Sequence, residues 1–452
     1  MTLGTFRHGV LLAGAVALAL ALGGCGGVGS GGGGGSGAAT QITTMGFGLP
    51  DEIATVRVQT YEKQSGVHVK VNEGDFDEQQ FLSAVASGNP PDVVRMDRNV
   101  IGTYAARGAL QPLDQCIKDA GVDMSAFRKP AVEQVTMDGK VWGLPEFYSV
   151  RVVIANDSVM QQAGLTIDQV ATGDWQQIAA ADKAMSAMNG GKIVRIGYDS
   201  KILDFLPMWA AANGAQILSE DGKKAQLDDP KVVEAVEFGA SLVQQQGGWA
   251  AVKAFRDSWD FFGEKNEYAM DQLGAMPMED WYVNQLAEVS KGPSGVTVAP
   301  FKDRQGNPIT YASGSAWAIP KDSAHPKEAC EFINTMTKAD TWVAAATARA
   351  AALRAKGASY TGTYTGNEKA DKVIFSEIYK PVEDPALDAA VKTVLSVQDK
   401  AFSLPASPAS AEFENAYKAG LNRVLEGQQT AQQAMAQAQQ EAQKALDAAA
   451  GS

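Results

Sequence analysis

The chain has 452 residues, of which 45% are hydrophobic and 20% charged, and its formal net charge is −13. That length exceeds what one hydrophobic core usually serves, and the hydrophobic share excludes wholesale disorder, so we expect two globular domains. The acidic balance argues against nucleic-acid binding, which needs a basic surface. Three His and three Cys leave little room for a metal centre built from protein ligands, and we expect no cofactor.

The N-terminus predicts an export signal. Only one charged residue, Arg7, precedes the apolar run at 10–22. This run is short for a membrane span, which needs about 20 apolar residues, but it fits a secretory signal peptide. It ends in LGGC at 22–25, which resembles the lipobox of bacterial lipoproteins. The resemblance implies that residues 1–24 are removed and that Cys25 takes a lipid; the alternative is an ordinary signal peptide with an incidental cysteine.

A glycine-rich segment follows the signal. Residues 26–37 are glycine except for two Ser and one Val. Such a segment forms no core and should behave as a coil of roughly 20 Å reach. We therefore expect residues 25–39 to tether a folded body to the outer face of a cell membrane. The predicted location is extracytoplasmic, and the only predicted membrane contact is the lipid anchor.

From residue 40 onward, predicted strands alternate with amphipathic helices. The strands are expected at 41–47, 67–72 and 92–96, and the helices at 52–64, 77–87 and 100–107. This alternation indicates an α/β fold with a largely parallel sheet covered on both faces. Ligands bind beyond the carboxyl ends of the strands in such sheets, so the loops after these three strands should meet at one site.

The rest of the chain is richer in helix. Helices are expected at 175–188, 204–213, 231–245, 326–337, 411–425 and 430–449, and strands at 296–300 and 315–320. The last helix is rich in Ala and Gln and only weakly amphipathic, so we expect it to fray.

Several motifs occur in a consistent order along the chain. They include GNPPDVV at 88–94, YAARGALQPL at 104–113, DGKVWGLP at 138–145 and GQQT at 427–430. Together they resemble the extracytoplasmic solute-binding proteins of ABC sugar importers, the maltose-binding-protein-like family. The chain departs from that family at 154–157, where it has IAND instead of the usual YYNK.

The resemblance implies a two-lobed periplasmic-binding-protein-like fold of type II, with discontinuous domains joined by a hinge. The first lobe would hold residues 40–149 and 301–338, and the second lobe residues 150–300 and 339–452. It implies capture of a mono- or oligosaccharide between the lobes and delivery to the transmembrane subunits of an ABC permease by hinge closure. We expect a monomer and no enzyme activity.

Two alternatives stay open. One is a binding protein for a phosphorylated polyol such as glycerol phosphate, or for another non-sugar solute; an anionic ligand would need several Arg side chains, and only Arg98 and Arg151 are obvious. The other is a secreted glycoside-acting enzyme that uses paired carboxylates. No G-x-S-x-G or H-E-x-x-H motif occurs in the sequence.

A sugar ring has two apolar faces and a rim of hydroxyl groups, so its recognition calls for aromatic plates together with carboxylate, amide and Arg side chains. The loops after the first three strands supply Phe47, Glu73, Asp75, Asp97, Arg98 and Asn99. The resemblance implies ligand contact after the third strand, with a solvated surface turn as the alternative. After the first two strands, the alternative is capping of the following helix.

The other candidates lie at the first crossing between lobes and beyond it: Tyr148, Arg151, Trp209, Trp259, Trp281, Ser313, Gly314 and Trp317. At the crossing, hinge packing or a structural ion pair is the alternative to ligand contact. The tryptophans other than Trp281 are equally compatible with a place in a lobe core. Trp281 matches the family's stacking Trp, although Glu279 stands where the family usually has Gly. Gly314 would permit a close backbone approach to a ligand.

Cys116 and Cys330 are the cysteines expected in the folded body, both in the first lobe. Outside the cytoplasm they could form a disulfide, and two buried free thiols are the alternative.

Overall fold

The structure is a computed structural model that describes residues 39–289, 294–381 and 384–450. The predicted signal peptide and the lipobox cysteine, Cys25, lie outside the described residues. Within those ranges the chain forms one compact unit. No helix in the described part of the chain is long and apolar enough to cross a membrane.

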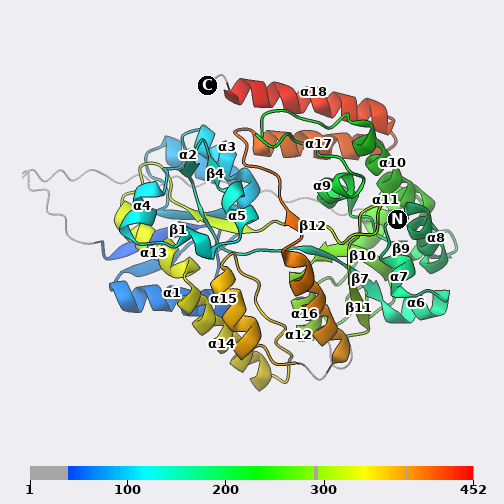
Figure 1. Ribbon diagram of the computed structural model, residues 1–452, viewed down its shortest axis with the longest axis horizontal. Coiled ribbons are helices and arrows are strands. Elements are labelled where there is room, and N and C mark those ends of the chain that lie inside the picture. Colours follow the sequence, from blue (N-terminus) through cyan, green and yellow to red (C-terminus); the bar gives the residue numbers. More distant parts are fainter. Residues whose placement is uncertain (1–38, 290–293, 382–383, 451–452) are drawn as a thin grey trace, which may run out of the picture. The chain divides into compact units, whose positions relative to one another are not determined.

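The first lobe is built on a five-stranded sheet with the order β2-β1-β3-β13-β6. Its strands are β1 (Gln41–Met45), β2 (His68–Val71), β3 (Val93–Asp97), β6 (Leu144–Pro145) and β13 (Ser315–Ala318). As predicted, β1 runs parallel to β2 and β3, whereas β13 returns antiparallel to both β3 and β6. The elements around this sheet are α1 (Glu52–Ser65), α2 (Glu78–Ala86), η1 (Arg98–Val100), α3 (Ile101–Ala106), α4 (Asp114–Asp119), η2 (Met124–Ala126), α5 (Lys129–Gln134), the hairpin β4 (Thr136–Met137) and β5 (Lys140–Val141), α13 (Pro326–Thr337), α14 (Ala339–Ala355), α15 (Glu368–Val373) and the π-turn η3 (Ile374–Ile378) (Figure 1).

The second lobe is built on another five-stranded sheet, with the order β11-β7-β10-β9-β8. Its strands are β7 (Arg151–Asn156), β8 (Ala187–Asn189), β9 (Lys192–Tyr198), β10 (Leu273–Glu279) and β11 (Val296–Pro300). The helices are α6 (Asp157–Ala163), α7 (Ile167–Val170), α8 (Trp175–Met185), α9 (Ile202–Ala212), α10 (Pro230–Gln245), α11 (Trp249–Arg256), α12 (Trp281–Val289), α16 (Pro385–Gln398), α17 (Ser410–Leu425) and α18 (Ala431–Ala450). Two short strands, β12 (Thr310–Tyr311) and β14 (Ala401–Phe402), pair with each other.

The second sheet differs from the largely parallel sheet that the sequence predicts. β7 runs antiparallel to both β10 and β11, and only β9 and β10 are parallel. The sequence does not predict β7 or β10 because each is a continuous apolar run buried on both sides, without the alternation that marks a half-exposed strand.

Local sequence signals set the element ends in the first lobe. α1 begins after Asp51, whose side chain accepts a hydrogen bond from the backbone N–H of Ala54, and ends at Gly66 with a left-handed φ of 73°.

Aromatic rings pack together in the core of the first lobe. Trp317 of β13 is fully buried and packs edge-on against Phe47 and Phe332.

Three chain segments connect the lobes. The first lies between β6 and β7, the second between β11 and β13, and the third follows α15 and η3. Ser149 of the first segment forms an antiparallel β-bridge with Ser313 of the second segment. Phe147, also of the first segment, forms a β-bridge with Thr365, which lies shortly before α15. The backbone of the connection is therefore cross-linked by hydrogen bonds.

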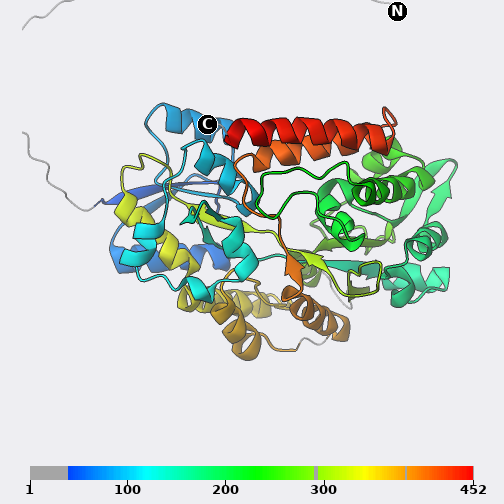
Figure 2. The same ribbon diagram turned by 45° about the horizontal axis from the view of Figure 1, so that its top comes forward.

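Helix α14 lies with the first lobe. The expected boundary at residue 338 assigns it to the second lobe, but α14 packs along α1, and its Trp342 is buried in a cluster with Ile53 of that helix. Figures 1 and 2 both show α14 beneath the first lobe.

The C-terminal helix is packed rather than frayed. α17 and α18 lie side by side in Figures 1 and 2. A stripe of α18 is buried, namely Ala431, Ala434, Met435, Ala438, Ala442 and Leu446. Gly420 of α17 makes this close approach possible, because a β-carbon at that position would lie 3.0 Å from the side chain of Ala438. The prediction of fraying is wrong because small residues here form a packing face, which a hydropathy pattern underrates.

Cys116 and Cys330 form a disulfide that joins α4 to α13 within the first lobe. Of the two alternatives that the sequence leaves open, the structure shows the bridged one.

Candidate functional site

A cavity of about 470 Å³ lies between the two lobes, beside the segments that connect them. Two neighbouring cavities, of about 470 and 450 Å³, share wall residues with it, and Arg95 lines all three. The three neighbouring cavities are together called the cleft below. Its first-lobe wall includes the strand ends, and its second-lobe wall comes from β10, α9, α12 and α17.

The carboxyl ends of the first three strands face the cleft. Phe47, Glu73 and Asp75 line one of its cavities, and Asp97 and Asn99 line another. The structure thus brings together five of the six residues expected after these strands. Asp97 is exposed to the cleft, but the surrounding protein removes part of the water from its carboxylate and raises its pKa, and Glu414 of α17 acts in the same direction. The side-chain amide of Asn99 donates a hydrogen bond to that Glu414.

Arg98 does not face the cleft. It is fully buried, and its guanidinium donates to the side-chain oxygen of Gln134 at 3.0 Å and to the backbone carbonyls of Phe147 and Ser313. Burial lowers its pKa to about 10. The prediction of ligand contact is wrong for this residue, because β3 ends at Asp97 and the turn into η1 directs Arg98 inward, where it fastens two connecting segments together.

Gly314 has a structural reason to be glycine. Its φ is 139°, and a β-carbon would lie 2.2 Å from the carbonyl oxygen of Phe147 and 2.6 Å from an Arg98 nitrogen. Ser313 and Gly314 both line the cleft. The absence of a side chain therefore serves the contact between two connecting segments.

Arg151 and Tyr148 lie at the first crossing and both line the cleft. The Arg151 guanidinium pairs with Glu279 at 3.0 Å and donates to the carbonyl of Tyr311 at 3.0 Å. It also lies over the rings of Phe205 and Tyr311, about 5 Å from each centroid. The residue thus has the structural ion pair that the sequence left as an alternative.

A buried carboxylate fixes the start of the crossing. Asp280 is 1% exposed and accepts hydrogen bonds from the Ser149 hydroxyl at 2.7 Å and the Val150 backbone N–H at 3.1 Å. Burial raises its pKa to about 7. Because Asp280 immediately precedes Trp281, the same contacts hold the backbone where α12 begins.

Asp280 should make stability depend on pH near neutrality. Its folded pKa lies above its ordinary value of 3.8, so the folded protein holds a proton that the unfolded chain releases, and this contribution to stability is lost as pH rises toward 7. Between pH 5 and pH 8, we expect the free energy of unfolding of the wild type to fall by about 2 kcal/mol relative to that of Asp280→Asn. Denaturant titrations of both proteins across this range measure the difference. Parallel pH profiles would show that Asp280 stays ionised.

The four tryptophans predicted to contact ligand divide into one that lines the cleft and three that do not. Trp281 begins α12, lines the cleft and is 37% exposed. Trp209 and Trp317 are fully buried, Trp209 in the second-lobe core with its indole N–H donating to the Ser200 carbonyl. Trp259 packs against Phe255 and is absent from the cleft wall. Ligand stacking by Trp209 and Trp317 is therefore a wrong prediction, because both rings are fully buried in lobe cores. Stacking by Trp259 stays a prediction.

Several cleft residues escape the sequence analysis. Arg95, Asp204, Glu279, Asn284, Tyr311, Thr363, Tyr364, Glu414 and Tyr417 all line the first cavity. A usable signal existed for Arg95, since it stands two residues before Asp97 on the same face of β3. None existed for Glu414 and Tyr417, because only the tertiary fold brings α17 over strand ends more than 300 residues away in sequence.

Every arginine that lines the cleft has a carboxylate partner, and further carboxylates line it as well. The arginines that line it all have carboxylate partners: Arg57 and Arg95 share Glu146, Arg151 pairs with Glu279, and Arg349 pairs with Glu52 and Glu288. Glu73, Asp75 and Asp97 also line the cleft. The site therefore presents acceptor oxygens to hydroxyl groups more readily than it presents free cations to an anion.

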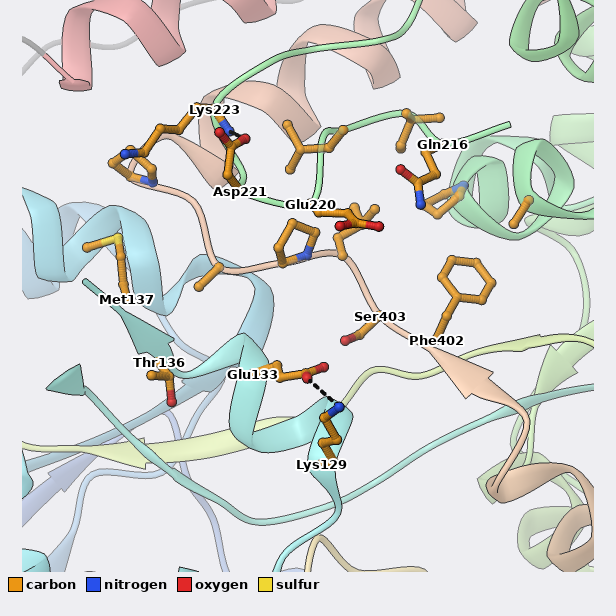
Figure 3. A pocket seen from close by; sticks show the side chains of 18 of the residues that line it. Lys129, Glu133, Thr136, Met137, Gln216, Glu220, Asp221, Lys223, Phe402 and Ser403 are labelled. Atoms are coloured by element: carbon orange, nitrogen blue, oxygen red, sulfur yellow. Dashed lines mark hydrogen bonds and ion pairs between the residues drawn. The ribbon is translucent and has the colours of Figure 1, made fainter. Parts of the chain in front are cut away.

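A larger cavity, of about 1380 Å³, shares no wall residue with the cleft. Figure 3 shows it between α5 with its following hairpin and the loop that carries Glu220, Asp221 and Lys223. Lys129 and Glu133 pair at 3.5 Å on one side of it, and the chain that follows β14, past Phe402 and Ser403, runs across it. None of the predicted ligand residues lines this cavity, and one aromatic ring is a poor platform for a sugar, so we place the functional site in the cleft.

No group of three or more His, Cys, Asp or Glu side chains in the described ranges is arranged to hold a metal ion.

Curated relatives match part of the chain. A putative binding protein of Brucella abortus is 23% identical over 58% of this chain and 62% of its own length. The maltodextrin-binding protein MdxE of Bacillus subtilis is 25% identical over 60% of this chain and 63% of its own length. The sn-glycerol-3-phosphate-binding periplasmic protein UgpB of Pectobacterium atrosepticum is also 25% identical, over 60% of this chain and 62% of its own length. The alignments thus span about three fifths of these relatives.

Solved structures match nearly the whole fold. CpMnBP1 with bound mannobiose superposes with a TM-score of 0.73 at 23% identity, covering 90% of this chain and 99% of that one. Maltose-bound MalE3 of T. maritima gives a TM-score of 0.67 at 19% identity, covering 90% of this chain and 100% of that one. The two-lobed periplasmic-binding-protein fold of type II is therefore confirmed.

The family assignment rests on a long continuous match. Residues 57–365 fit the family described as bacterial extracellular solute-binding protein. This range includes β2, β3, β6 and β13 of the first sheet and the whole second sheet. Members of this family bind solutes and are not enzymes. The chain belongs to the bacterial extracellular solute-binding protein family.

Proposed function

We propose that the protein is the substrate-binding lipoprotein of an ABC transporter and that it captures a carbohydrate in the cleft. The observation that carries the proposal is the cleft itself, which combines the accessible Trp281 ring of one lobe with the Asp97 carboxylate of the other. A sugar needs an apolar plate and hydroxyl acceptors at the same time. The sugars named for MdxE and for CpMnBP1 agree with this chemistry.

Both lobes contribute to the cleft wall, so a bound ligand would link them. In the structure they already meet on that wall: Arg349 of α14 pairs with Glu288 of α12 at 2.7 Å and with Glu52 of α1 at 2.9 Å. The Asn284 amide of α12 donates to the Gly362 carbonyl at 3.2 Å. Such contacts would form and break as the lobes close around the ligand and reopen at the permease.

The export signal predicted from the sequence supports the remaining part of the proposal. The lipobox ending at Cys25 and the glycine-rich tether would hold a monomeric body beside its membrane partner, the transmembrane subunits of the permease. The ligand would then be released within reach of the transport channel.

A phosphorylated polyol is the second candidate ligand, because UgpB is named for sn-glycerol 3-phosphate. The ion pairs of the cleft arginines argue against a phosphorylated ligand. A phosphate would have to draw Arg95 or Arg151 away from a carboxylate that the guanidinium already holds.

Calorimetry with the mature protein tests the proposal. Maltose, maltotriose, mannobiose, mannotriose and lactose are titrated beside glycerol 3-phosphate and a short peptide, with Trp fluorescence as a second readout. We expect at least one saccharide to bind with a Kd in the micromolar range or below and glycerol 3-phosphate to bind at least about a hundredfold more weakly. Tight binding of glycerol 3-phosphate without binding of any saccharide would refute the carbohydrate assignment.

A further inference from the structure

One buried tyrosine hydroxyl in the second lobe faces two hydrogen-bond acceptors. The Oη atom of Tyr282, in the first turn of α12, lies 2.7 Å from a carboxyl oxygen of Glu267. It also lies 2.9 Å from the backbone carbonyl oxygen of Phe261, in the loop of residues 257–263 that is called the Phe261 loop below. A neutral phenol has a single hydrogen to donate. Tyr282 and Glu267 are both 0% exposed, so bulk water does not reach either side chain.

The proton on Glu267 decides how the phenolic hydrogen is used. A protonated Glu267 can donate to the Tyr282 oxygen, which leaves the phenolic hydrogen for the Phe261 carbonyl, so both hydrogen bonds are made. An ionised Glu267 has no hydrogen to donate, and it attracts the phenolic hydrogen more strongly than a neutral carbonyl does. The Phe261 carbonyl then loses its donor, which costs the stability of one hydrogen bond.

The Phe261 loop lies against the part of α12 that forms the cleft wall. A second hydrogen bond from this helix, from the side-chain amide of Gln285 to the Phe262 carbonyl at 2.7 Å, also fastens the loop. The Phe261 ring stacks on the Tyr282 ring at 4.3 Å and meets the Trp281 ring at 6.3 Å. Because Trp281 lines the cleft, a loosened Phe261 loop would disturb a ring that a ligand contacts.

The surroundings of Glu267 place its titration near neutral pH. Burial raises the pKa of the Glu267 carboxyl to about 7, and Asp199 acts in the same direction, against the Tyr282 hydrogen bond and the charge of Lys201. Arg256 of α11 is paired with Asp199 at 3.2 Å. The second carboxyl oxygen of Glu267 has no hydrogen-bond partner in the described part of the chain, which suits a neutral carboxyl better than a carboxylate. The ionisable groups that interact with Glu267 and Tyr282 from the elements around them are Asp199, Lys201, Asp260 and Tyr268.

We propose that Glu267 is a positioning residue whose proton controls, through Tyr282, how firmly the Phe261 loop is held beside Trp281, and so makes saccharide affinity depend on pH. With Glu267 protonated, the loop is fastened before the ligand arrives. With Glu267 ionised, the loop is loose, and ordering it reduces the free energy available for binding. The effect on affinity rests on the proposed function, whereas the effect on the loop does not.

Amide hydrogen exchange of the ligand-free mature protein tests the state of the loop. Glu267→Gln supplies a permanent donor to the Tyr282 oxygen, and Tyr282→Phe removes the hydroxyl that binds the Phe261 carbonyl. At pH 8.5 the wild-type Phe261 loop should exchange about fivefold faster than that of Glu267→Gln and about as fast as that of Tyr282→Phe. At pH 5.5 the wild type should match Glu267→Gln. The variants are compared at the same pH, so the intrinsic exchange rates cancel.

Calorimetry tests whether the loop is coupled to the ligand. The probe is whichever of maltose, maltotriose, mannobiose, mannotriose and lactose binds the wild type most tightly. The Kd of the wild type, divided by that of Glu267→Gln, should rise about fivefold from pH 5.5 to pH 8.5, because the form that binds better holds the proton. Near pH 7, saccharide binding should take up a fraction of a proton in the wild type that it does not take up in Glu267→Gln. The ratio removes the titration of Asp97 and Asp280, which both proteins share.

Tyr379→Phe is the matched control. The Tyr379 hydroxyl also donates to a carboxylate, that of Asp388 at 2.6 Å, and neither residue lines the cleft. This variant should follow the wild type in both measurements, and thermal melts report whether each variant is folded.

Each outcome decides one level of the inference. Equal exchange of the Phe261 loop in the wild type and Glu267→Gln at pH 8.5 would overturn the role of Glu267 and leave the proposed function standing. A Kd ratio that stays constant with pH would overturn the coupling to the ligand. If no saccharide binds the wild type, the proposed function fails together with that coupling, and the exchange comparison still decides whether Glu267 controls the loop.

Discussion

Replacing Trp281 with alanine should weaken saccharide binding more than tenfold without unfolding the protein. The ring lines the cleft and is 37% exposed, so its removal deletes the apolar plate without opening a cavity in the core. The variant should weaken short and long saccharides alike, because every ligand that enters the cleft meets Trp281. Calorimetry gives the affinities, and a thermal melt reports the fold.

Trp259→Ala is the matched control for this prediction and also tests whether Trp259 contacts the ligand. Trp259 belongs to the same lobe but packs against Phe255 away from the cleft wall. It should lower stability and leave saccharide affinity within about twofold. Equal losses of affinity in the two variants, or no loss in Trp281→Ala, would contradict the placement of the ligand.

Replacing Glu146 with alanine should destabilise the protein by about 3 to 5 kcal/mol. Glu146 is completely buried and accepts hydrogen bonds from Arg57 at 2.8 Å, from Arg95 and from the Ser315 hydroxyl at 2.8 Å. Its removal leaves the Arg57 guanidinium, which is 1% exposed and lies 3.9 Å from the Trp342 ring centroid, without its carboxylate. Burial already lowers the pKa of Arg57, so that cation depends on its partner.

The same cluster should make the protein sensitive to acid. Burial alone would raise the pKa of Glu146, but Arg95 and Arg57 outweigh it and hold the pKa at about 2. Because the folded pKa lies below the ordinary value of 4.5, the stabilisation is complete above that value and is lost as pH falls from about 4.5 toward 2.

Urea titrations at pH 7 and at pH 3.5 measure both effects. Glu62→Ala, which removes one partner of the exposed pair with His68, is the control and should cost less than about 1 kcal/mol. A Glu146→Ala variant as stable as that control would show that the buried cluster contributes nothing. We also expect Arg95 to shift without its partner, so the affinity of this variant should change as well.

The sequence predicts the first lobe well because local signals determine it there. The strand-helix alternation from residue 40 to 107 is regular, and the loops after β1, β2 and β3 do meet at the cleft. Asp97 and Arg98 show a case in which reasoning from sequence patterns fails. They are neighbours in sequence, yet the turn after β3 directs one toward solvent and the other into the protein, and no periodicity describes a single turn.

The second-lobe half of the site is less accessible to sequence reasoning. The local sequence around a tryptophan does not show whether its ring is buried in the core, like that of Trp209, or lines the cleft, like that of Trp281. The exposure of the ring depends on which tertiary neighbours cover it. The contributions of Glu414 and Tyr417 depend on how α17 packs across both lobes. Such long-range packing leaves no local trace in composition or spacing.

The most direct test of the account is a crystal structure of the mature protein with the saccharide that binds most tightly. We predict that the sugar lies between Asp97 and Asn99 of the first lobe and Glu279 and Trp281 of the second, with one ring face on the Trp281 indole. A sugar seated instead in the cavity lined by Lys129 and Glu220, with the cleft empty, would contradict it.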